Sequence, residues 1–264
     1  MTCRFESEQV VVSMTSFPEA IPYAVKSIRS ILNGSVLPDK VVLYLTFSQF
    51  ENGEIPLCLK NLSENNKIFE IRNYVRDIRS YRKLIPALSD FPEAVIVTVD
   101  DDVAYHKHML RDLINFHQQF PNAVLAHRVK RIRVGVSYRR WRKYRWYDFI
   151  FKRIHQSYLN LQTGVGGVLY PPQSLRKDML DVELFLRIAP STDDIWFWAA
   201  AVANGCYVVP VPFGRNKPHG LKKPKELSLK TSNFKGKIDR NLKALNEILE
   251  RYPEIRTRLY DESI

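Results

Sequence analysis

The sequence has few cysteines and no long apolar run. Its three cysteines, Cys3, Cys58 and Cys206, lie far apart in a chain of 264 residues. This spacing argues against a disulfide framework or a CxxC metal site and is typical of a reducing compartment. No apolar run approaches the roughly 20 residues of a membrane-spanning helix. The N-terminal residues MTCRFESEQ hold early acids and no apolar core, so we expect no secretory signal and a cytoplasmic protein.

Common glycine-rich nucleotide loops are also missing. The run TGVGGVLYPP at residues 163–172 is neither a GxGxxG followed by a helix nor a Walker A motif. Internal repeats and low-complexity segments are absent. Over the whole sequence 45% of the residues are hydrophobic and 26% are charged, which is the composition of a globular domain able to bury a core.

Positive charge is concentrated in two segments. Lys and Arg number 40 against 28 Asp and Glu, a net charge of +12. Residues 128–153 hold 11 basic residues and one acid, and residues 215–240 hold nine basic residues and two acids, so the remainder is mildly acidic. Such segments attract phosphates, nucleic acid or an anionic membrane surface.

The first basic segment, from Arg128 to Arg153, is also rich in aromatic residues. Basic residues interleaved with aromatics suit a membrane interface or single-stranded nucleic acid. The alternative is a solvated helical face with a few core aromatics. We favour an interaction surface, because many exposed aromatics without a partner are a liability. The aromatic residues are Tyr138, Trp141, Tyr144, Trp146, Tyr147, Phe149 and Phe151.

The first half of the chain alternates strand-like and helix-like segments, which predicts an α/β fold with a mostly parallel, Rossmann-like sheet flanked by helices. In such sheets the ligand site lies beyond the carboxyl ends of the strands, so the loops after Met14, Ile71 and Val99 are the places to examine. The predicted strands cover residues 9–14, 40–45, 67–71 and 94–99, and the predicted helices 20–32, 54–62, 82–88 and 107–120.

The second half is less regular, and no linker separates it from the first. A helix near residues 195–204, a strand at 206–211 and a terminal helix near 239–252 are predicted. We expect one domain over residues 1–264. Its nucleotide-binding half would be residues 9–127 and its acceptor half residues 128–264.

Three consecutive carboxylates, Asp100, Asp101 and Asp102, follow the apolar strand at residues 94–99. They repel one another unless a cation neutralises them. In an extended chain Asp100 and Asp102 point the same way and share one hard cation, Mg²⁺ or Mn²⁺, completed by substrate phosphates. The alternative is an acidic turn. The position at the carboxyl edge of a parallel strand favours the metal site.

A second acidic pair, Asp193 and Asp194, precedes a predicted helix. Ser191 as N-cap, with Asp194 closing a capping box, would explain the pair as a helix start alone. A second carboxylate pair is also what general-base catalysis requires. The two roles are compatible, because a cap site holds a carboxylate rigidly.

Taken together, these segments resemble the bacterial GT-A-fold glycosyltransferases of the family-2-like type, which act in lipopolysaccharide and capsule assembly. The matches run in family order from about residue 10 to 212, and they indicate a sugar-nucleotide glycosyltransferase without naming the sugar. The matching segments are VVSMTSFP (11–18), SYRKLIPAL (80–88), VTVDDDVAY (97–105), TGVGGVLYPP (163–172) and PSTDDIWFWA (190–199). The chain departs from the family at residues 106–108, where a proline-rich turn is expected.

The resemblance implies roles for the acidic residues. Asp100 and Asp102 correspond to the DxD motif, which holds the divalent metal and the donor's diphosphate and ribose, and Asp101 would face the sugar. Asp193 and Asp194 correspond to the pair that contains the catalytic base in inverting members, and we favour Asp194 as that base.

The resemblance also assigns positions around the donor. Thr15, Ser16 and Phe17 would line the nucleotide, and Asp77 would lie at the base or ribose. The diphosphate would contact Arg79, Arg82 and Lys83. Gly166 and Gly167 would form the floor beneath donor and acceptor, and His219 would be a C-terminal metal or phosphate contact. A lone loop histidine is more often simply solvated.

The implied reaction moves a sugar from a nucleotide-sugar donor to a saccharide acceptor, with Mn²⁺ or Mg²⁺ as the metal. UDP- and GDP-linked donors are both open. A lipid-linked or core oligosaccharide acceptor would place the enzyme at the inner face of the cytoplasmic membrane, docked through residues 128–153 with Trp141 and Trp146 at the interface. We expect no nucleic-acid partner.

Two other functions remain open. A non-enzymatic nucleic-acid-binding protein would explain the charge but leaves Asp100–Asp102 without a purpose, and these carboxylates would repel a phosphate backbone. A sugar-1-phosphate nucleotidyltransferase usually carries a glycine-rich GxGxR-type loop after the first strand. Here that loop reads SMTSFP, which argues against this class.

Overall fold

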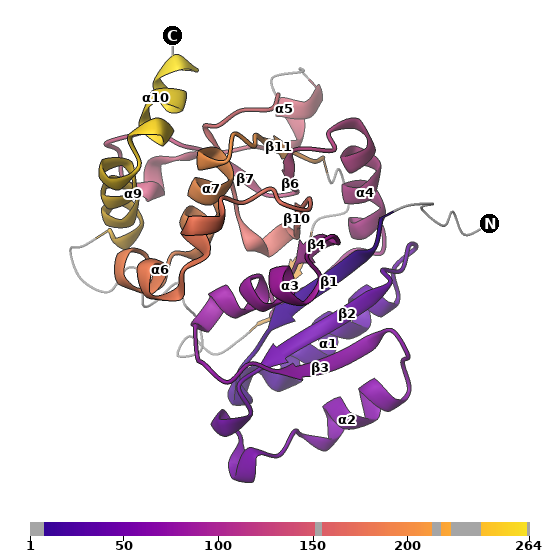
Figure 1. Ribbon diagram of the computed structural model, residues 1–264. Coiled ribbons are helices and arrows are strands. Elements are labelled where there is room, and N and C mark those ends of the chain that lie inside the picture. Colours follow the sequence, from indigo (N-terminus) through magenta and orange to yellow (C-terminus); the bar gives the residue numbers. More distant parts are fainter. Residues whose placement is uncertain (1–7, 151–154, 213–217, 223–238, 263–264) are drawn as a thin grey trace.

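The computed structural model describes residues 8–150, 155–212, 218–222 and 239–262 (Figure 1). Its largest element is a seven-stranded sheet in the order β11-β6-β10-β4-β1-β2-β3. Within it β10 runs antiparallel to β4 and β6, and the other pairs are parallel, which confirms the predicted mostly parallel sheet. The strands are β1 (Val10–Thr15), β2 (Lys40–Leu45), β3 (Phe69–Asn73), β4 (Val95–Thr98), β6 (Val124–Ala126), β10 (Val168–Tyr170) and β11 (Val208–Pro210).

Strand β1 lies inside the sheet and is covered on both faces. Val12 pairs with Val41 of β2 and Val97 of β4, and all three are fully buried. Val11 points into one hydrophobic cluster, whereas Val12 and its same-face neighbours belong to the other. This alternation, with apolar residues on both faces, is expected of a parallel strand buried between two helical layers.

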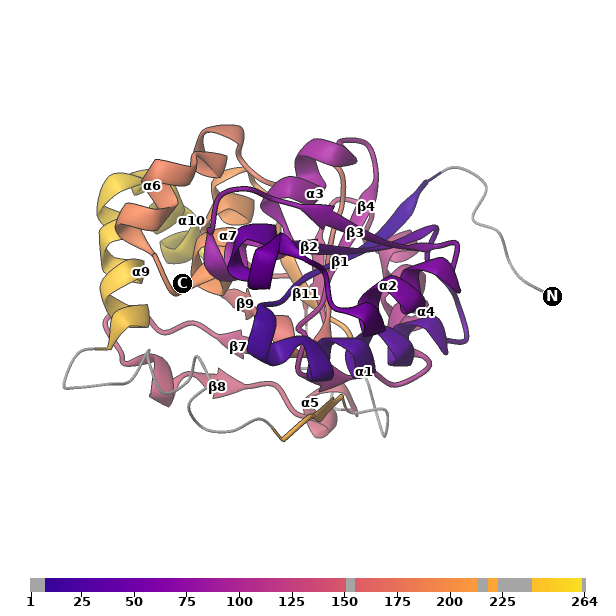
Figure 2. The same ribbon diagram turned by 90° about the horizontal axis from the view of Figure 1, so that it is seen from below.

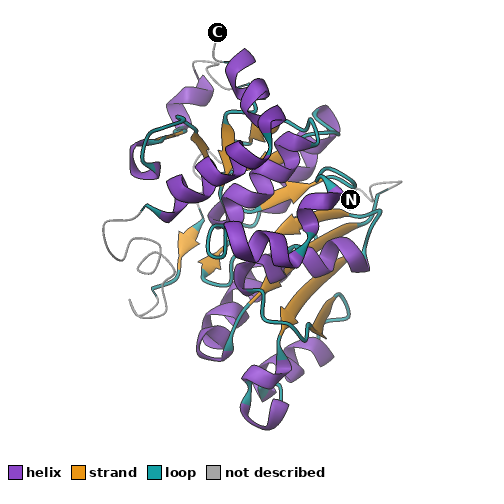
Figure 3. Ribbon diagram, turned by 60° about the vertical axis from the view of Figure 1, so that its left-hand side comes forward, coloured by secondary structure: helices purple, strands orange, loops and turns teal. Residues whose placement is uncertain are grey.

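Helices cover both faces of the sheet (Figure 3). One face is covered by α1 (Ile21–Leu32), α2 (Leu57–Glu64) and α4 (Met109–Gln119). The other is covered by α3 (Ile85–Asp90), α6 (Val182–Ile188), α7 (Asp193–Ala203), α9 (Arg240–Arg251) and α10 (Pro253–Asp261). None of the helices in the described segments is long and apolar enough to cross a membrane.

Helix α7 is apolar around nearly its whole circumference. Trp196 and Trp198 are fully buried, and their indole N–H groups donate to the carbonyls of Met179 (2.7 Å) and Tyr158 (2.8 Å). A helix that is hydrophobic all round needs packing on every side, and α9 and α10 both contact α7. The first residues of α7 are therefore attached to a rigid element.

Two smaller sheets complete the chain. One joins β7 (Val129–Arg131), β8 (Arg142–Lys143) and β9 (Asn160–Gln162), and α5 (Trp146–Ile150) follows β8. Figure 2 shows β7 and β8 along one border of the molecule. The other sheet pairs β5 (Val103–Ala104) with β12 (His219–Gly220).

Some predicted boundaries were wrong. The predicted helix at 82–88 is a 3₁₀ helix, Arg79–Lys83, followed after Leu84 by α3. Helix α2 begins at Leu57, three residues later than predicted, immediately after a proline. Strands β6 and β10 were not predicted, because a three-residue strand is too short to show a period.

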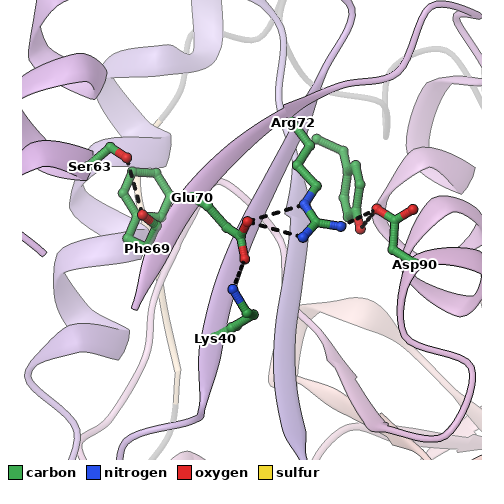
Figure 4. A network of polar contacts seen from close by, with 7 residues as sticks. Lys40, Ser63, Phe69, Glu70, Arg72 and Asp90 are labelled. Carbon is green, nitrogen blue, oxygen red and sulfur yellow. Dashed lines mark hydrogen bonds and ion pairs between the residues drawn. The ribbon is translucent and has the colours of Figure 1, made fainter. Parts of the chain in front are cut away.

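The outer edge of the sheet is closed by charged side chains (Figure 4). Glu70 of β3 pairs with Lys40 of β2 and with Arg72, and Arg72 also pairs with Asp90 at the end of α3 (2.6 Å). The Tyr44 hydroxyl donates to the same Asp90 carboxylate (2.7 Å). Charges on an edge strand discourage pairing with other chains, and this network is a structural feature of β3.

Candidate active site

Asp100, Asp101 and Asp102 lie at the carboxyl end of β4, as predicted. The backbone of Asp100 is held from two sides: its N–H donates to the Tyr105 hydroxyl (2.8 Å), and its carbonyl accepts from Ser27 of α1 (2.9 Å). The chain turns at residues 101–102 to enter β5. The condition of an extended chain is therefore not met, so the two-residue alternation that would align Asp100 with Asp102 does not apply.

Asp193 and Asp194 are the first two residues of α7. The N-cap is Thr192 and not Ser191, and the Thr192 side chain makes no capping hydrogen bond. One carboxylate oxygen of Asp194 instead accepts from the backbone N–H of Gly164 (3.2 Å). A helix start alone therefore does not explain the pair, because Asp194 is bonded across to the glycine-rich run.

Lys83 joins the two acidic groups. Its ammonium lies 3.1 Å from Asp100 and 3.0 Å from Asp193, and the Lys83 side chain is only 8% exposed. Its backbone carbonyl accepts a 2.6 Å hydrogen bond from Ser13 of β1. The loop after β4 and the start of α7, more than 90 residues apart in sequence, thus meet at one buried cation.

Gly164 is the glycine that lies against these residues. A Cβ added there would be 2.7 Å from an Asp100 carboxylate oxygen and 2.8 Å from the Lys83 ammonium, so a side chain cannot fit without displacing them. A Cβ at Gly166 or Gly167 would instead meet the segment after β6 or helix α4. Spacing alone does not show which glycine faces the carboxylates, and the assignment of Gly166 and Gly167 to the floor beneath donor and acceptor stays a prediction.

The charges in this cluster shift one another's ionisation. Burial, followed by the charge of Asp193, raises the pKa of Asp194 to about 7, while Lys83 and the hydrogen bond from Gly164 oppose the rise. Burial alone would lower the pKa of Lys83, but the surrounding carboxylates, with Asp100 the strongest, hold it well above the usual value. Lys83 is therefore a permanent cation, and Asp194 titrates near neutrality.

Arg82 is buried and serves the protein itself rather than facing a ligand. Its guanidinium donates to the Thr15 hydroxyl (2.7 Å), to Thr46 and to the carbonyl of Ser16 (2.8 Å). The Ser16 hydroxyl in turn donates to Asp101 (2.6 Å). Arg82 thus supports the loop after β1, and through Ser16 that loop supports the turn after β4. The sequence-based expectation that it meets a diphosphate is not what these bonds indicate.

Asp77 and Arg79 lie on the loop after β3. Asp77 is half exposed and accepts from Gln49 (3.1 Å) and from the backbone N–H of Arg79 (2.9 Å). Arg79 donates to the carbonyl of Pro190, just before α7 (3.3 Å). Phe17 is the extended residue before the 3₁₀ turn that follows β1. These residues border the strand ends without joining the carboxylate cluster.

His219 is brought next to the acidic turn by backbone pairing. It lies opposite Ala104 in the β12–β5 pair, and the following Leu221 N–H donates to the carbonyl of Asp102 (2.7 Å). His219 is exposed. The C-terminal segment therefore returns to the loop after β4, as the predicted C-terminal contact requires.

The donor atoms present suit a cation that is shared with a ligand. Among the residues that the structure describes, no group of three or more His, Cys, Asp or Glu side chains is arranged to hold a metal ion. Mg²⁺ and Mn²⁺ bind through one or two carboxylates together with phosphate oxygens and water. The carboxylates of the turn after β4, Asp100 and Asp102, are of the residue type that such a metal–diphosphate site uses, and the described side chains form no all-protein cage.

The segment from Arg128 to Arg153 forms β7, β8 and α5, and the expected exposure of Trp141 was wrong. Trp141 is 3% exposed, and its indole N–H donates to the carbonyls of Arg133 and Val136. The Trp146 side chain and residues 151–153 lie outside what the structure describes. The exposed basic residues of this hairpin are Arg133, Arg139, Arg140, Arg142, Lys143 and Arg145.

The fold defined by this sheet and its helical layers is GT-A-like, as predicted. The chain is similar to a mannosyltransferase from Pyrobaculum calidifontis, solved in complex with GDP-Man and Mn²⁺. The TM-score is 0.54 at 13% identity, covering 98% of this chain and 76% of the other. No family model and no curated protein sequence matches the chain. At this identity the similarity establishes the fold alone, so an activity has to be argued from the residues of the site.

Proposed function

We propose that this protein is a metal-dependent glycosyltransferase that moves a sugar from a nucleotide-sugar donor to a saccharide acceptor. One observation carries the proposal: two carboxylate groups from distant segments meet at Lys83 beside the carboxyl ends of the parallel strands. Ligands bind at this edge in open α/β sheets. The GT-A-like fold, found also in the mannosyltransferase that holds GDP-Man and Mn²⁺, supports the same chemistry.

The donor-side residues would come from residues 9–127. Asp100 and Asp102 would hold Mn²⁺ or Mg²⁺, which when bound neutralises the leaving nucleotide diphosphate. Thr15, Ser16 and Phe17 follow β1 at the same sheet edge and would line the nucleotide, which is UDP or GDP. Asp77 would lie toward the base or ribose.

The acceptor side would come from residues 128–264, with Asp194 as the general base. A base works best when its pKa lies near the operating pH, and the pKa of Asp194 is raised to about 7. Asp194 would take the proton from the acceptor hydroxyl as that oxygen attacks the anomeric carbon. A single displacement of this kind inverts the anomeric centre.

A thermal-shift screen tests the proposal. Wild-type protein is heated with UDP, GDP and their sugar derivatives, with and without Mn²⁺, beside Asp102→Ala and the surface control Asp178→Ala. A ligand of the folded state raises the melting temperature. We expect a Mn²⁺-dependent rise with one nucleotide class in wild type and Asp178→Ala and none in Asp102→Ala. Folded protein that responds to no nucleotide contradicts the proposal.

We further propose that the acceptor is a lipid-linked or core oligosaccharide of bacterial lipopolysaccharide or capsule assembly, used at the inner membrane face. The exposed basic residues of the β7–β8 hairpin support this, since each basic residue near an anionic surface contributes about 1 kcal/mol of attraction. In liposome sedimentation at low salt, Arg139→Glu with Arg140→Glu should release the protein. Lys60→Glu with Arg256→Glu, which changes the charge equally, should not. No binding of wild type to anionic liposomes contradicts membrane docking.

A further inference from the structure

Lys83 occupies a place that four other segments of the chain shape around it. Ser13 of β1 holds its backbone carbonyl, Asp100 after β4 and Asp193 of α7 hold its ammonium, and Gly164 leaves the space that a Cβ would fill. A lysine on the surface needs no such partners, because water solvates its ammonium at little cost. The geometry indicates a specific role for a cation at this point.

The Lys83 ammonium is surrounded by carboxylates that a metal ion would also need. One ammonium is buried against the carboxylates of Asp100 and Asp193, with Asp194 also close enough to raise its pKa. Removing one partner of a buried ion pair leaves a charge without compensation. A divalent cation at Asp100 would meet an opposing positive charge, because the Lys83 ammonium already pairs with that carboxylate.

We propose that Lys83 is a positioning residue that links the donor-binding carboxylate Asp100 to the helix carrying the base, and that weakens metal binding at Asp100 until the donor diphosphate arrives. This inference rests on the proposed function. In the free protein the ammonium fills the role of counter-ion for both acidic groups. Metal and diphosphate then bind together, because the phosphate oxygens supply the negative charge that Asp100 alone, shared with Lys83, does not.

The first test is Mn²⁺ binding to the nucleotide-free protein, measured by the electron paramagnetic resonance of free Mn²⁺. Lys83→Met keeps an unbranched side chain that is one heavy atom shorter and removes the charge. We expect this variant to bind Mn²⁺ roughly tenfold more tightly than wild type, which corresponds to about 1.4 kcal/mol. We also expect Mn²⁺ to raise its melting temperature more than that of wild type. A lysine that only supports the fold would leave Mn²⁺ affinity unchanged or lower it.

A second pair of variants keeps the proposal testable if Lys83→Met does not fold. Asp193→Asn removes the partner of Lys83 on α7, so the ammonium pairs with Asp100 alone and should weaken Mn²⁺ binding severalfold. Asp194→Asn is the matched control, because it removes the same charge from the next residue, which makes no ion pair with Lys83. Asp193→Asn should therefore weaken Mn²⁺ binding more than Asp194→Asn does.

The outcomes separate this inference from the proposed function. Unchanged or weaker Mn²⁺ binding by folded Lys83→Met overturns the role of Lys83, as do equal effects of the two asparagine variants. Neither measurement uses turnover. Tighter Mn²⁺ binding by Lys83→Met in a protein whose wild type responds to no nucleotide sugar would leave the Lys83 role standing and remove the transferase.

Discussion

The two acidic groups of the site contain the same side chains in different surroundings. Asp100–Asp102 lie in a turn after β4, whereas Asp193 and Asp194 begin a helix packed on all sides. In the turn, Asp100 pairs with Lys83, Asp101 accepts a hydrogen bond from Ser16, and all three carboxylates are only partly buried. At the helix start, burial and a neighbouring carboxylate raise the pKa of Asp194 to about 7. In the proposed mechanism these different surroundings would let side chains of one residue type serve as a metal ligand in one group and as the base in the other.

The strongest test of this difference is to remove the base. Asp194→Asn keeps the shape of the side chain and cannot accept a proton, so kcat should fall by about 10² to 10⁴. Donor affinity, followed by nucleotide thermal shift, should change little, because the donor carboxylates lie in the other group. Near-normal turnover of Asp194→Asn would defeat the base assignment.

Gly164 touches both groups, and its substitution should disturb both at once. In Gly164→Ala the new Cβ displaces Asp100 or Lys83, and the backbone donor to Asp194 shifts with it. A misplacement near 1 Å can cost about 10² in rate, so kcat/KM should fall by about that factor. Gly135→Ala is the control for the loss of a glycine away from the site: it adds backbone strain at a φ of +74°, but nothing lies within 4 Å of its added Cβ. Equal activities of the two variants would show that Gly164 does not shape the site.

The pH dependence should come from the α7 pair. Below pH 7 the folded protein holds the Asp194 proton, so kcat/KM should rise about tenfold per pH unit and level off above about 7. A profile that is flat between pH 5 and 8 would contradict this assignment.

The raised pKa of Asp194 should also make the folded protein less stable as the pH rises. Between about pH 4 and 7 the unfolded chain releases the Asp194 proton and the folded protein keeps it, so stability falls as pH rises. Asp194→Asn removes this effect and should be more stable than wild type at pH 8, with no difference near pH 4. Denaturant titration at both pH values measures it.

The smallest effect is expected in the turn. Ser16→Ala removes the hydrogen bond to Asp101, and a hydrogen bond to a charged group contributes about 1.5–3 kcal/mol. Because the turn is partly solvated, we expect the low end: an increase in donor KM of up to about tenfold with kcat within twofold. A change confined to kcat would mean that the turn and the helix start are not separate in function.

Much of the fold could be predicted from local pattern. Runs of β-branched residues predicted β1, β2 and β4, and helical spacing predicted α1, α4, α7 and α9 within a few residues. Strands β6 and β10, with three residues each, could not be predicted, because they exist through their pairing with neighbours and not through a pattern of their own.

The sequence singled out the acidic residues of the candidate site but not the contacts between them. Asp100 and Asp194 stood out as carboxylates next to a strand end and a helix start. Lys83 and Gly164 were not recognised as contacts of these acids, because they lie in other segments and only packing brings them together. Trp141 was expected at the surface, and its burial depends on the hairpin that folds over it.

Apolar periodicity along the chain specifies the class of fold, and the residue types limit the chemistry that the site can perform. Tertiary structure alone decided that Lys83 pairs with Asp100 and Asp193, that Arg82 supports the loop after β1, and that Asp194 titrates near neutrality. The reason is physical: periodicity is a local property of the chain. Ion pairing and pKa depend on burial and on distances of a few ångströms between residues far apart in sequence.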